Sequence, residues 1–533
     1  MQTTGSAGRV KTWVAMVALC AATGAWGQEA APVRGVPAAS APKPPAFLSA
    51  YDASLNLAST NAALKKAARE YVLGLCDNEQ APAPERGDAA LFSARIYTDD
   101  RDYEKALQSY RKVFKYGVQP ASLATTLKPA FGTMAAVGAN IKDPPRVRAA
   151  FQQAMADGTW LTEDLRVSFA MAFAGYLKGI GSTNEAVAVL DQSLKDTPNA
   201  TPAMRAAAVR ARTEIYAERP ADRAKARAGY EELIAMGESA GVPTLCWAYT
   251  ACADTWAQEG NAGKSIELLH ACIKLPSAPA TLLYAPLAAL LAQPMTDAQA
   301  AATFVLLRER IAGSIDTSMA EACQQTVVRL LLARRRNPEA LQEARVLFYT
   351  TSDRTVQPAV DLVMAGLKAV DSNLGRVNRF LKFQKYGPAG EDGKPGTADD
   401  LDDVLRTVPP LQDPERARIF EGGLKGLPDD WAGWKKRGQL QFYLGRPDEA
   451  FKCYRRAFDL CPLTAAELQG VTDLLTGVVI RQTKDAAAAR QLVQFLMFGS
   501  AGKDGKEGTE DDLADPCPAI VAKLKAAPEP TKP

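Results

Sequence analysis

The segment WAGWKKRGQLQFYLGRPDEAFKCYRRAFDLCP, which begins at Trp431, constrains the fold more than any other part of the chain. Apolar residues recur at helical spacing on both sides of Gly445, so the segment predicts two helices joined by a tight turn. Small residues at Gly438 and Ala450 would let two antiparallel helices approach closely, and Pro462 cannot continue the second helix. The segment therefore predicts a helical hairpin.

This hairpin resembles the tetratricopeptide repeat (TPR), a helix pair of about 34 residues. The residues that carry the resemblance are Trp434, Gly438, Gly445, Ala450, Tyr454, Ala457 and Pro462. The sequence departs from the family pattern at two positions, where Arg437 replaces a leucine and Gln441 replaces a tyrosine. The resemblance implies an all-α fold in which antiparallel helix pairs stack into a superhelical solenoid. It also implies a groove that receives a protein or peptide.

Weaker copies of the pattern occur upstream, around Ala94–Tyr110, Ala174–Pro198, residues 205–238 and Tyr249–Cys272. Residues 280–386 are also helical in pattern but keep no repeat signature, so we interpret them as degenerate repeats. A repeat array explains how 533 residues can fold without one oversized core, because each repeat contacts only its neighbours. No alternating strand pattern appears, which favours an all-α chain.

Residues 1–27 predict a secretory signal peptide. Arg9 and Lys11 precede an apolar stretch that is too short to span a bilayer, and the residues before Gln28 fit the small-x-small cleavage rule. A lipoprotein attached through Cys20 is the alternative. We therefore expect an exported bacterial protein of the periplasm or the cell exterior.

Composition divides the remainder of the chain into further segments. We expect a Pro/Ala-rich linker at 28–46, a helical-repeat array at 47–386, an acidic Gly-rich loop at 387–404, TPR-like helices at 405–498, a second acidic loop at 499–516 and a tail at 517–533.

The two acidic loops match each other closely at a distance of 112 residues, as YGPAGEDGKPGTADDLDD from Tyr386 and FGSAGKDGKEGTEDDLAD from Phe498. Ca²⁺ takes six to eight oxygen ligands, and glycines allow a short loop to fold around it. The candidate ligands are Asp392, Thr397, Asp399, Asp400 and Asp403 in the first loop and Asp504, Thr509, Asp511, Asp512 and Asp515 in the second. The alternative is a metal-free turn followed by a helix cap, which Asp-Gly and Thr-x-Asp-Asp also favour. Both interpretations stay open.

The composition excludes several classes of function. His270 is the single histidine, which argues against most histidine-dependent hydrolases and metal sites, and no nucleotide-binding or zinc-protease motif occurs. The net charge of +3, without a basic patch, predicts no nucleic-acid binding. We therefore expect a non-catalytic scaffold for a protein or peptide partner, with no cofactor except possible Ca²⁺. An enzyme or carbohydrate-active accessory protein that carries helical repeats is the alternative.

Eight cysteines follow the predicted signal peptide, and they show no CxxC spacing. Most fall in amphipathic helical pattern, so we predict mainly buried, free thiols. Cys252 and Cys272 lie at facing places of one predicted helix pair, and we expect them to come within disulfide distance.

Overall fold

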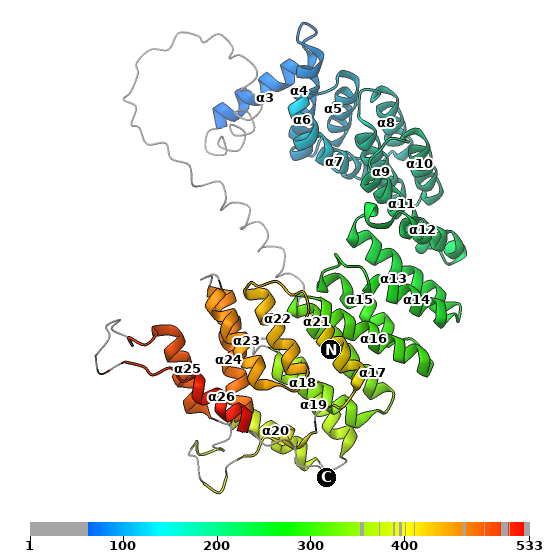
Figure 1. Ribbon diagram of the computed structural model, residues 1–533. Coiled ribbons are helices and arrows are strands. Elements are labelled where there is room, and N and C mark those ends of the chain that lie inside the picture. Colours follow the sequence, from blue (N-terminus) through cyan, green and yellow to red (C-terminus); the bar gives the residue numbers. More distant parts are fainter. Residues whose placement is uncertain are drawn as a thin grey trace, which may run out of the picture. The chain divides into compact units, whose positions relative to one another are not determined.

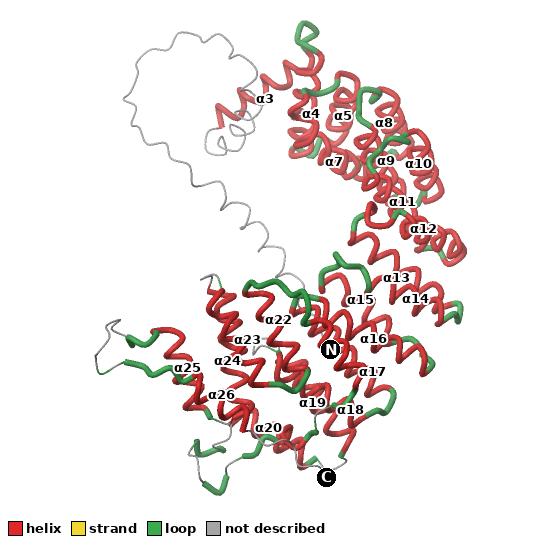
Figure 2. Tube along the Cα trace, viewed as in Figure 1, coloured by secondary structure: helices red, strands yellow, loops and turns green. Residues whose placement is uncertain are grey.

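A computed structural model describes residues 62–351, 356–371, 374–386, 390–393, 397–399, 401–409, 411–461, 465–483, 485–502, 510 and 512–526. Helices make up most of this part of the chain, and it contains no strand (Figure 2). The predicted all-α fold is confirmed. None of the helices in the described ranges combines the length and apolarity needed to cross a membrane. The predicted signal peptide and linker lie outside the described residues.

The chain divides into two units, residues 1–81 and 82–533. The described part of the first unit is helix α3 (Ala62–Asp77). The second unit holds all later helices. It opens with the pair α4 (Ala83–Asp99) and α5 (Tyr103–Tyr116).

Helices of the second unit then alternate between two rows (Figure 1). The first row consists of α7 (Lys128–Ala139), α9 (Glu163–Gly179), α11 (Pro202–Ala217), α13 (Val242–Gln258), α15 (Ala280–Leu291), α17 (Thr317–Ala333) and α19 (Val356–Val370). The second row consists of α8 (Pro144–Asp157), α10 (Thr183–Asp196), α12 (Arg223–Ala235), α14 (Ala262–Ile273), α16 (Asp297–Gly313) and α18 (Asn337–Thr350). Each first-row helix packs against the next first-row helix, as expected for a helical-repeat solenoid.

Short elements connect some of these helices. They are α6 (Pro120–Ser122), the π-helical turn η2 (Leu123–Leu127) and the 3₁₀ turns η3 (Pro220–Asp222) and η4 (Gly237–Ala240).

The turns inside the helix pairs follow one design. Gly181, Gly260 and Gly445 have φ angles of 82°, 82° and 77°, the left-handed conformation that ends a helix and reverses the chain. Arg101 and Arg335 occupy the same place in two other pairs, with φ angles of 61° and 58°. A residue with a β-carbon is strained in this conformation. Because arginine stands where the other turns have glycine, these two turns lack the glycine by which the sequence pattern is recognised.

The C-terminal part of the chain folds back onto the middle of the array. It contains α20 (Gly375–Tyr386), η6 (Val404–Thr407), α21 (Pro414–Gly423), α22 (Trp431–Tyr443), α23 (Pro447–Leu460), α24 (Ala465–Thr483), α25 (Ala486–Phe498) and α26 (Cys517–Ala526). Helix α21 packs on α16, and both α22 and α24 contact α18. One hydrophobic core joins residues of 328–380 to residues of 442–524. The segment expected as a tail therefore contains a helix, α26, which packs on α23 and α24.

The helices of this region repeat at a fixed distance. Helices α21, α22 and α23 end 110 residues after α16, α17 and α18, and α25 ends 112 residues after α20. Identical residues occupy matching places in α18 and α23 or just before them: Arg336 and Arg446, Glu339 and Glu449, Ala340 and Ala450, Arg345 and Arg455, Phe348 and Phe458. Residues 297–386 therefore have the same order of helices as the recognisable C-terminal repeat and its neighbours.

Candidate interaction surface and the C-terminal repeat

The residues that carry the repeat signature pack the two helices of the C-terminal hairpin together. A β-carbon placed on Gly438 of α22 would lie 2.5 Å from ring carbons of Tyr454 on α23, so only glycine fits this crossing. Tyr454, Ala450 and Ala457 are fully buried. Trp434 is half-buried against the same core, and Pro462 lies outside the described residues.

The opposite side of α22 is also covered, by the chain itself. The ammonium group of Lys436, a residue only 1% exposed, donates to the backbone carbonyl of Ile311 at the end of α16. It also donates to Oε1 of Gln439 at 2.9 Å. Burial lowers the pKa of Lys436 to about 7, because the lost hydration outweighs the smaller opposite effects of Cys323 and Asp316. The one strongly marked repeat therefore has no open helix face toward α16.

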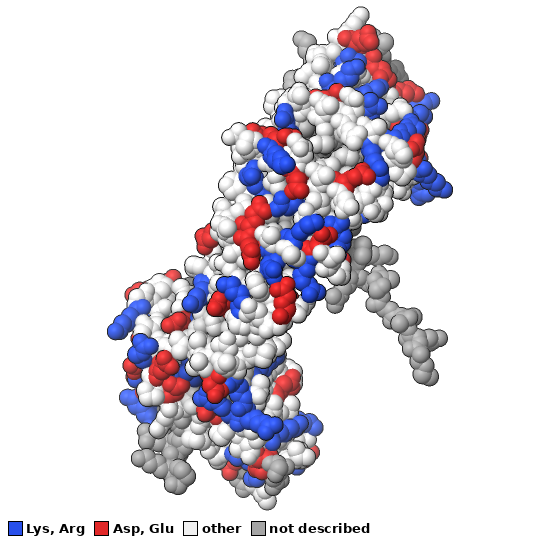
Figure 3. All heavy atoms as spheres, turned by 90° about the vertical axis from the view of Figure 1, so that its right-hand side faces the viewer, with Lys and Arg blue, Asp and Glu red and all other residues white. Residues whose placement is uncertain are grey.

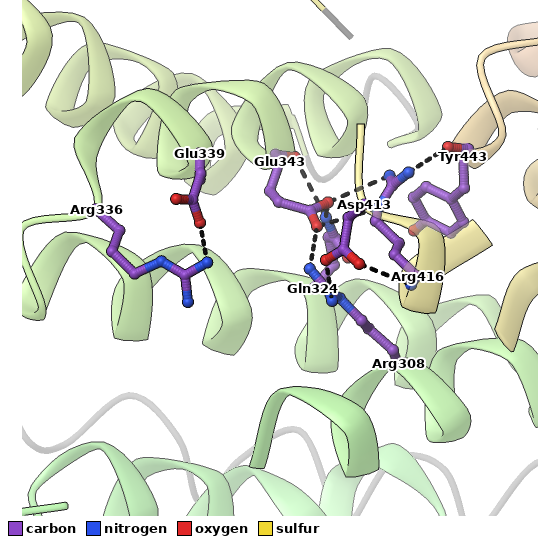
Figure 4. Close-up of polar contacts among 8 residues, drawn as sticks. All are labelled: Arg308, Gln324, Arg336, Glu339, Glu343, Asp413, Arg416 and Tyr443. Carbon is purple, nitrogen blue, oxygen red and sulfur yellow. Dashed lines mark hydrogen bonds and ion pairs between the residues drawn. The ribbon is translucent and has the colours of Figure 1, made fainter. Parts of the chain in front are cut away.

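A buried ion cluster connects α21 to α16, α17 and α18 (Figure 4). The carboxylate of Glu343 on α18 is 1% exposed and accepts from Nε of Arg416 on α21 at 3.1 Å. It also accepts from Arg308 on α16 at 3.2 Å and from Gln324 on α17 at 2.7 Å. Arg308 reaches Asp413, the residue that caps α21, at 2.6 Å. Burial raises the pKa of Glu343, but Arg416 and Arg308 outweigh burial and hold it below its usual value.

This cluster fixes the position of α21 and the helix that follows it. Arg416 donates a further hydrogen bond of 2.6 Å to the carbonyl of Tyr443, the last residue of α22. Sequence reasoning missed these residues, because charged side chains in helices usually indicate a solvated face. The partners of the ion pairs lie 35 to 105 residues apart in the chain, and no local pattern reveals them.

The first row offers an exposed face on α11, α13 and α15. The guanidinium of Arg210 on α11 stacks 4.7 Å above the ring of Trp247 on α13 and pairs with Glu214 at 2.9 Å. Tyr284 on α15 is 53% exposed. Asp254, one helical turn beyond Ala251 on α13, is exposed and has no hydrogen-bond or ion-pair partner among the described residues.

The carboxyl group of Asp254 is partly desolvated by neighbouring protein. Desolvation raises the pKa of its carboxyl group although the side chain is open to solvent. Helices α11, α13 and α15 thus carry the half-buried ring of Trp247, the exposed ring of Tyr284 and an exposed carboxylate that a cation would stabilise.

The side of the molecule that carries α10, α12 and α14 looks different. Lys and Arg side chains alternate with Asp and Glu side chains over most of this face (Figure 3). Interspersed charges of both signs are typical of a solvated surface and provide no large field of one sign.

The twin acidic loops use their carboxylates for contacts within the chain. The carboxylate of Asp399 accepts from the backbone amides of Glu391 and Asp392 at 2.7 and 3.0 Å and from the Thr397 hydroxyl at 2.6 Å. These hydrogen bonds, the Thr397 hydroxyl first, lower the pKa of Asp399. Asp403 is 2% exposed and accepts from the Leu405 amide at 2.9 Å.

Asp403 also accepts from the buried hydroxyl of Tyr349 at 2.5 Å, so it caps η6 and anchors the loop to α18. In the second loop Asp515 accepts from the Cys517 amide at 2.9 Å, at the start of α26. The turn-and-cap alternative expected Thr397 and Thr509 to start the following helices, whereas the capping side chains are Asp403 and Asp515. Thr397 donates to Asp399 instead, and Thr509 lies outside the described residues.

No group of three or more His, Cys, Asp or Glu residues suited to a metal ion occurs in the described part of the chain. Asp400, Asp504, Thr509 and Asp511 lie outside it. Asp392, Thr397, Asp399, Asp403, Asp512 and Asp515 are described, but they do not form a calcium site together. The calcium interpretation stays an untested prediction.

His270 has a packing role. Its Nε2 lies 2.8 Å from the Thr303 hydroxyl, between α14 and α16. Burial, with a smaller contribution from Lys274, lowers the pKa of the imidazole. All eight cysteines after the predicted signal peptide are free thiols, and seven are buried, as predicted. The neighbour of Cys272 is Cys246, whereas Cys252 packs in another core.

Comparison with protein families agrees with the hairpin geometry. Residues 431–463, which span α22 and α23, match the model of the tetratricopeptide repeat. The chain is a TPR-like helical-repeat protein. A search of curated proteins gave no match. The TPR match coincides with the hairpin in which a glycine faces a tyrosine, and the other helices of this TPR-like protein also pack as pairs.

Proposed function

We propose that this TPR-like protein is a non-catalytic scaffold of the bacterial envelope or exterior that binds a protein or peptide partner on the exposed face of α11, α13 and α15. The observation that carries the proposal is that this face holds both an exposed carboxylate without a partner among the described residues, Asp254 on α13, and the 53% exposed ring of Tyr284 on α15. The corresponding surface of the C-terminal repeat is covered by α16 and α21, so the partner surface lies earlier in the array.

The chemistry of the face indicates what kind of segment it would bind. Aromatic side chains supply large contact area with little loss of conformational entropy, and such residues dominate binding energy at protein interfaces. The carboxylate of Asp254 favours a cation in a partly desolvated place. The expected partner segment therefore carries Lys or Arg next to apolar side chains.

Affinity capture with the mature protein tests the proposal. The double variant Tyr284→Ala, Asp254→Asn removes the exposed ring and the free charge, and neither side chain is buried, so the fold should persist. A matched control is Met155→Ala, which removes a 38% exposed apolar side chain from α8 in the second row. We expect a partner captured by the native protein and by the control to lose at least about tenfold in affinity for the double variant, equivalent to about 1.4 kcal/mol. Equal affinities would contradict this site.

We also propose export, on the basis of the charged, apolar and small-residue pattern of residues 1–27. N-terminal sequencing of the protein purified from its native cells should begin at Gln28, and cell fractionation should place it outside the cytoplasm. A cytoplasmic protein that retains residues 1–27 would contradict export without affecting the proposed partner surface.

A further inference from the structure

Two cysteines meet inside the helix pair α13–α14. The thiol of Cys272 on α14 donates to the backbone carbonyl of Cys246 on α13, with the sulfur 3.9 Å from the oxygen. Both residues belong to the same hydrophobic core, where Cys246 is 3% exposed and Cys272 is fully buried. Their helices are adjacent in sequence and pack along their length.

The two sulfurs also differ in acidity. A hydrogen bond from the Cys272 thiol lowers the pKa of Cys246, against the effect of burial and with help from Arg310. The same hydrogen bond, followed by burial, raises the pKa of Cys272. Cys246 is therefore the sulfur that more readily becomes the nucleophilic thiolate.

Cys252, the next cysteine along α13, packs in a different core. Cys252 lies six residues after Cys246, about 240° around the helix. It packs with Tyr230 and Leu233 of α12, and burial raises its pKa to about 11. This rotation is why Cys252, which the sequence pattern suggested as the partner of Cys272, faces a different core.

We propose that Cys246 and Cys272 form a dithiol–disulfide couple that links α13 to α14. With a small-molecule disulfide as oxidant, Cys246 loses its proton and attacks one sulfur of the oxidant, which forms a mixed disulfide and releases one thiolate. Cys272 then loses its proton, and its sulfur attacks Sγ of Cys246 and releases the second thiolate. The two released thiolates take up the two protons, so two protein thiols are oxidised and one external disulfide is reduced.

The link would restrain the helix pair that carries Trp247 and Asp254. It closes the segment from residue 246 to residue 272 and so reduces the conformational freedom of the unfolded chain. Because both thiols are buried, oxidation requires transient opening of α14 away from α13. The expected reaction is therefore slow in the folded protein and insensitive to changes elsewhere in the array.

Peptide mapping of the full-length protein tests the couple directly. The protein is incubated with oxidised glutathione, its remaining thiols are alkylated, and it is digested with trypsin and chymotrypsin. Cleavage after Lys264 separates Cys272 from α13, and cleavage after Trp247 or Tyr249 separates Cys246 from Cys252. We expect a linked peptide that joins Cys246 to Cys272 and disappears on reduction.

Variants provide the matched comparison. Cys252→Ala should keep the link, whereas Cys246→Ala should abolish it. Oxidation should raise the Tm of the native protein and of Cys252→Ala by a few degrees and leave that of Cys246→Ala unchanged. The proposal is overturned if mapping of the native protein recovers Cys246 and Cys272 as free thiols while the less buried Cys517 is oxidised. It is also overturned if Cys272 is linked to Cys252.

Discussion

Replacing Lys436 by Met should change the pH dependence of stability around α22. The ammonium group of Lys436 is buried between α22 and the end of α16, where it contacts the Ile311 carbonyl and the Gln439 amide oxygen. Asp316 and Cys323 are the titratable groups that act on it, and both raise its pKa less than burial lowers it. Methionine has a similar length and carries no charge, so it removes the titration and keeps most of the packing.

The magnitude follows from the difference between the two states. The pKa of Lys436 is about 7 in the folded protein and about 10.5 in an exposed lysine. Between these values the unfolded chain binds a proton that the folded chain does not bind, so the free energy of unfolding rises with pH. The full effect is about 1.4 kcal/mol per pH unit, or about 2 kcal/mol between pH 8 and pH 9.5. Below about pH 7 both states are protonated and the slope disappears.

Hydrogen exchange of the full-length protein measures this locally. Peptides from α22 are followed by mass spectrometry at pH 8 and pH 9.5, after correction for the intrinsic exchange rate. The native protein should gain about 2 kcal/mol of local stability over this range relative to Lys436→Met. Lys452→Met, which removes an exposed lysine of α23, is the matched control and should keep the native slope. Equal slopes in the native protein and Lys436→Met would show that Lys436 stays charged in the fold.

Four further predictions test other parts of the structure. Gly438→Leu should lower the free energy of unfolding of the C-terminal part by about 1–3 kcal/mol, because its side chain collides with the Tyr454 ring; an unchanged urea transition would contradict this packing. Glu343→Gln should destabilise α21 and α22 by about 3–5 kcal/mol, since it leaves the buried Arg416 without a carboxylate and Arg308 with Asp413 alone. Because the folded-state pKa of Glu343 lies below its usual value, this contribution should vanish in the native protein only as the pH falls through that lowered pKa. Arg335→Gly should raise stability by about 1 kcal/mol and Gly445→Ala should lower it by a similar amount, because both positions have φ near +60° to +80°; opposite signs in thermal unfolding would refute the argument. The calcium interpretation of the twin loops predicts that millimolar Ca²⁺ raises the Tm and that the double variant Asp399→Ala, Asp511→Ala abolishes the increase. If calorimetry detects no heat of binding at several millimolar Ca²⁺, the loops are metal-free turns and caps.

The sequence predicted the local features well because they depend on short spacings. Helix pairs, their turn glycines and the close approach of Gly438 to the second helix are properties of segments of about 34 residues. The docking of α21 and α22 on α16 depends instead on contacts between distant residues. Lys436 and Ile311 are 125 residues apart, and Arg416 and Glu343 are 73 apart. When two charged residues are this far apart in the chain, nothing in the sequence around either of them indicates that they are buried together.

The acidic loops show the same limit at a smaller scale. The spacing of Asp403 fits a metal ligand and a helix cap equally well, because both roles need a carboxylate at the end of a glycine-bearing loop. The contact that separates these roles is the hydrogen bond from Tyr349, which comes from a helix 54 residues earlier. The pattern within the loop could not indicate that this carboxylate is buried.

The repeated helices explain why residues 297–386 lost their repeat signature while keeping the fold. At matching places of the two hairpins, α22 and α23 bring Gly438 against Tyr454, whereas α17 and α18 carry Val328 and Ala344. All of these side chains except that of the glycine lie buried in one hydrophobic core. In the pair α22–α23 the small residue is on the first helix, whereas in the pair α17–α18 it is on the second helix and the larger residue is on the first. Helix packing depends on the combined volume at a crossing, so a small residue on either helix of the pair lets the two helices pack together. A pattern that requires glycine on the first helix cannot detect the exchanged pair, although the physical requirement for one small residue is still met.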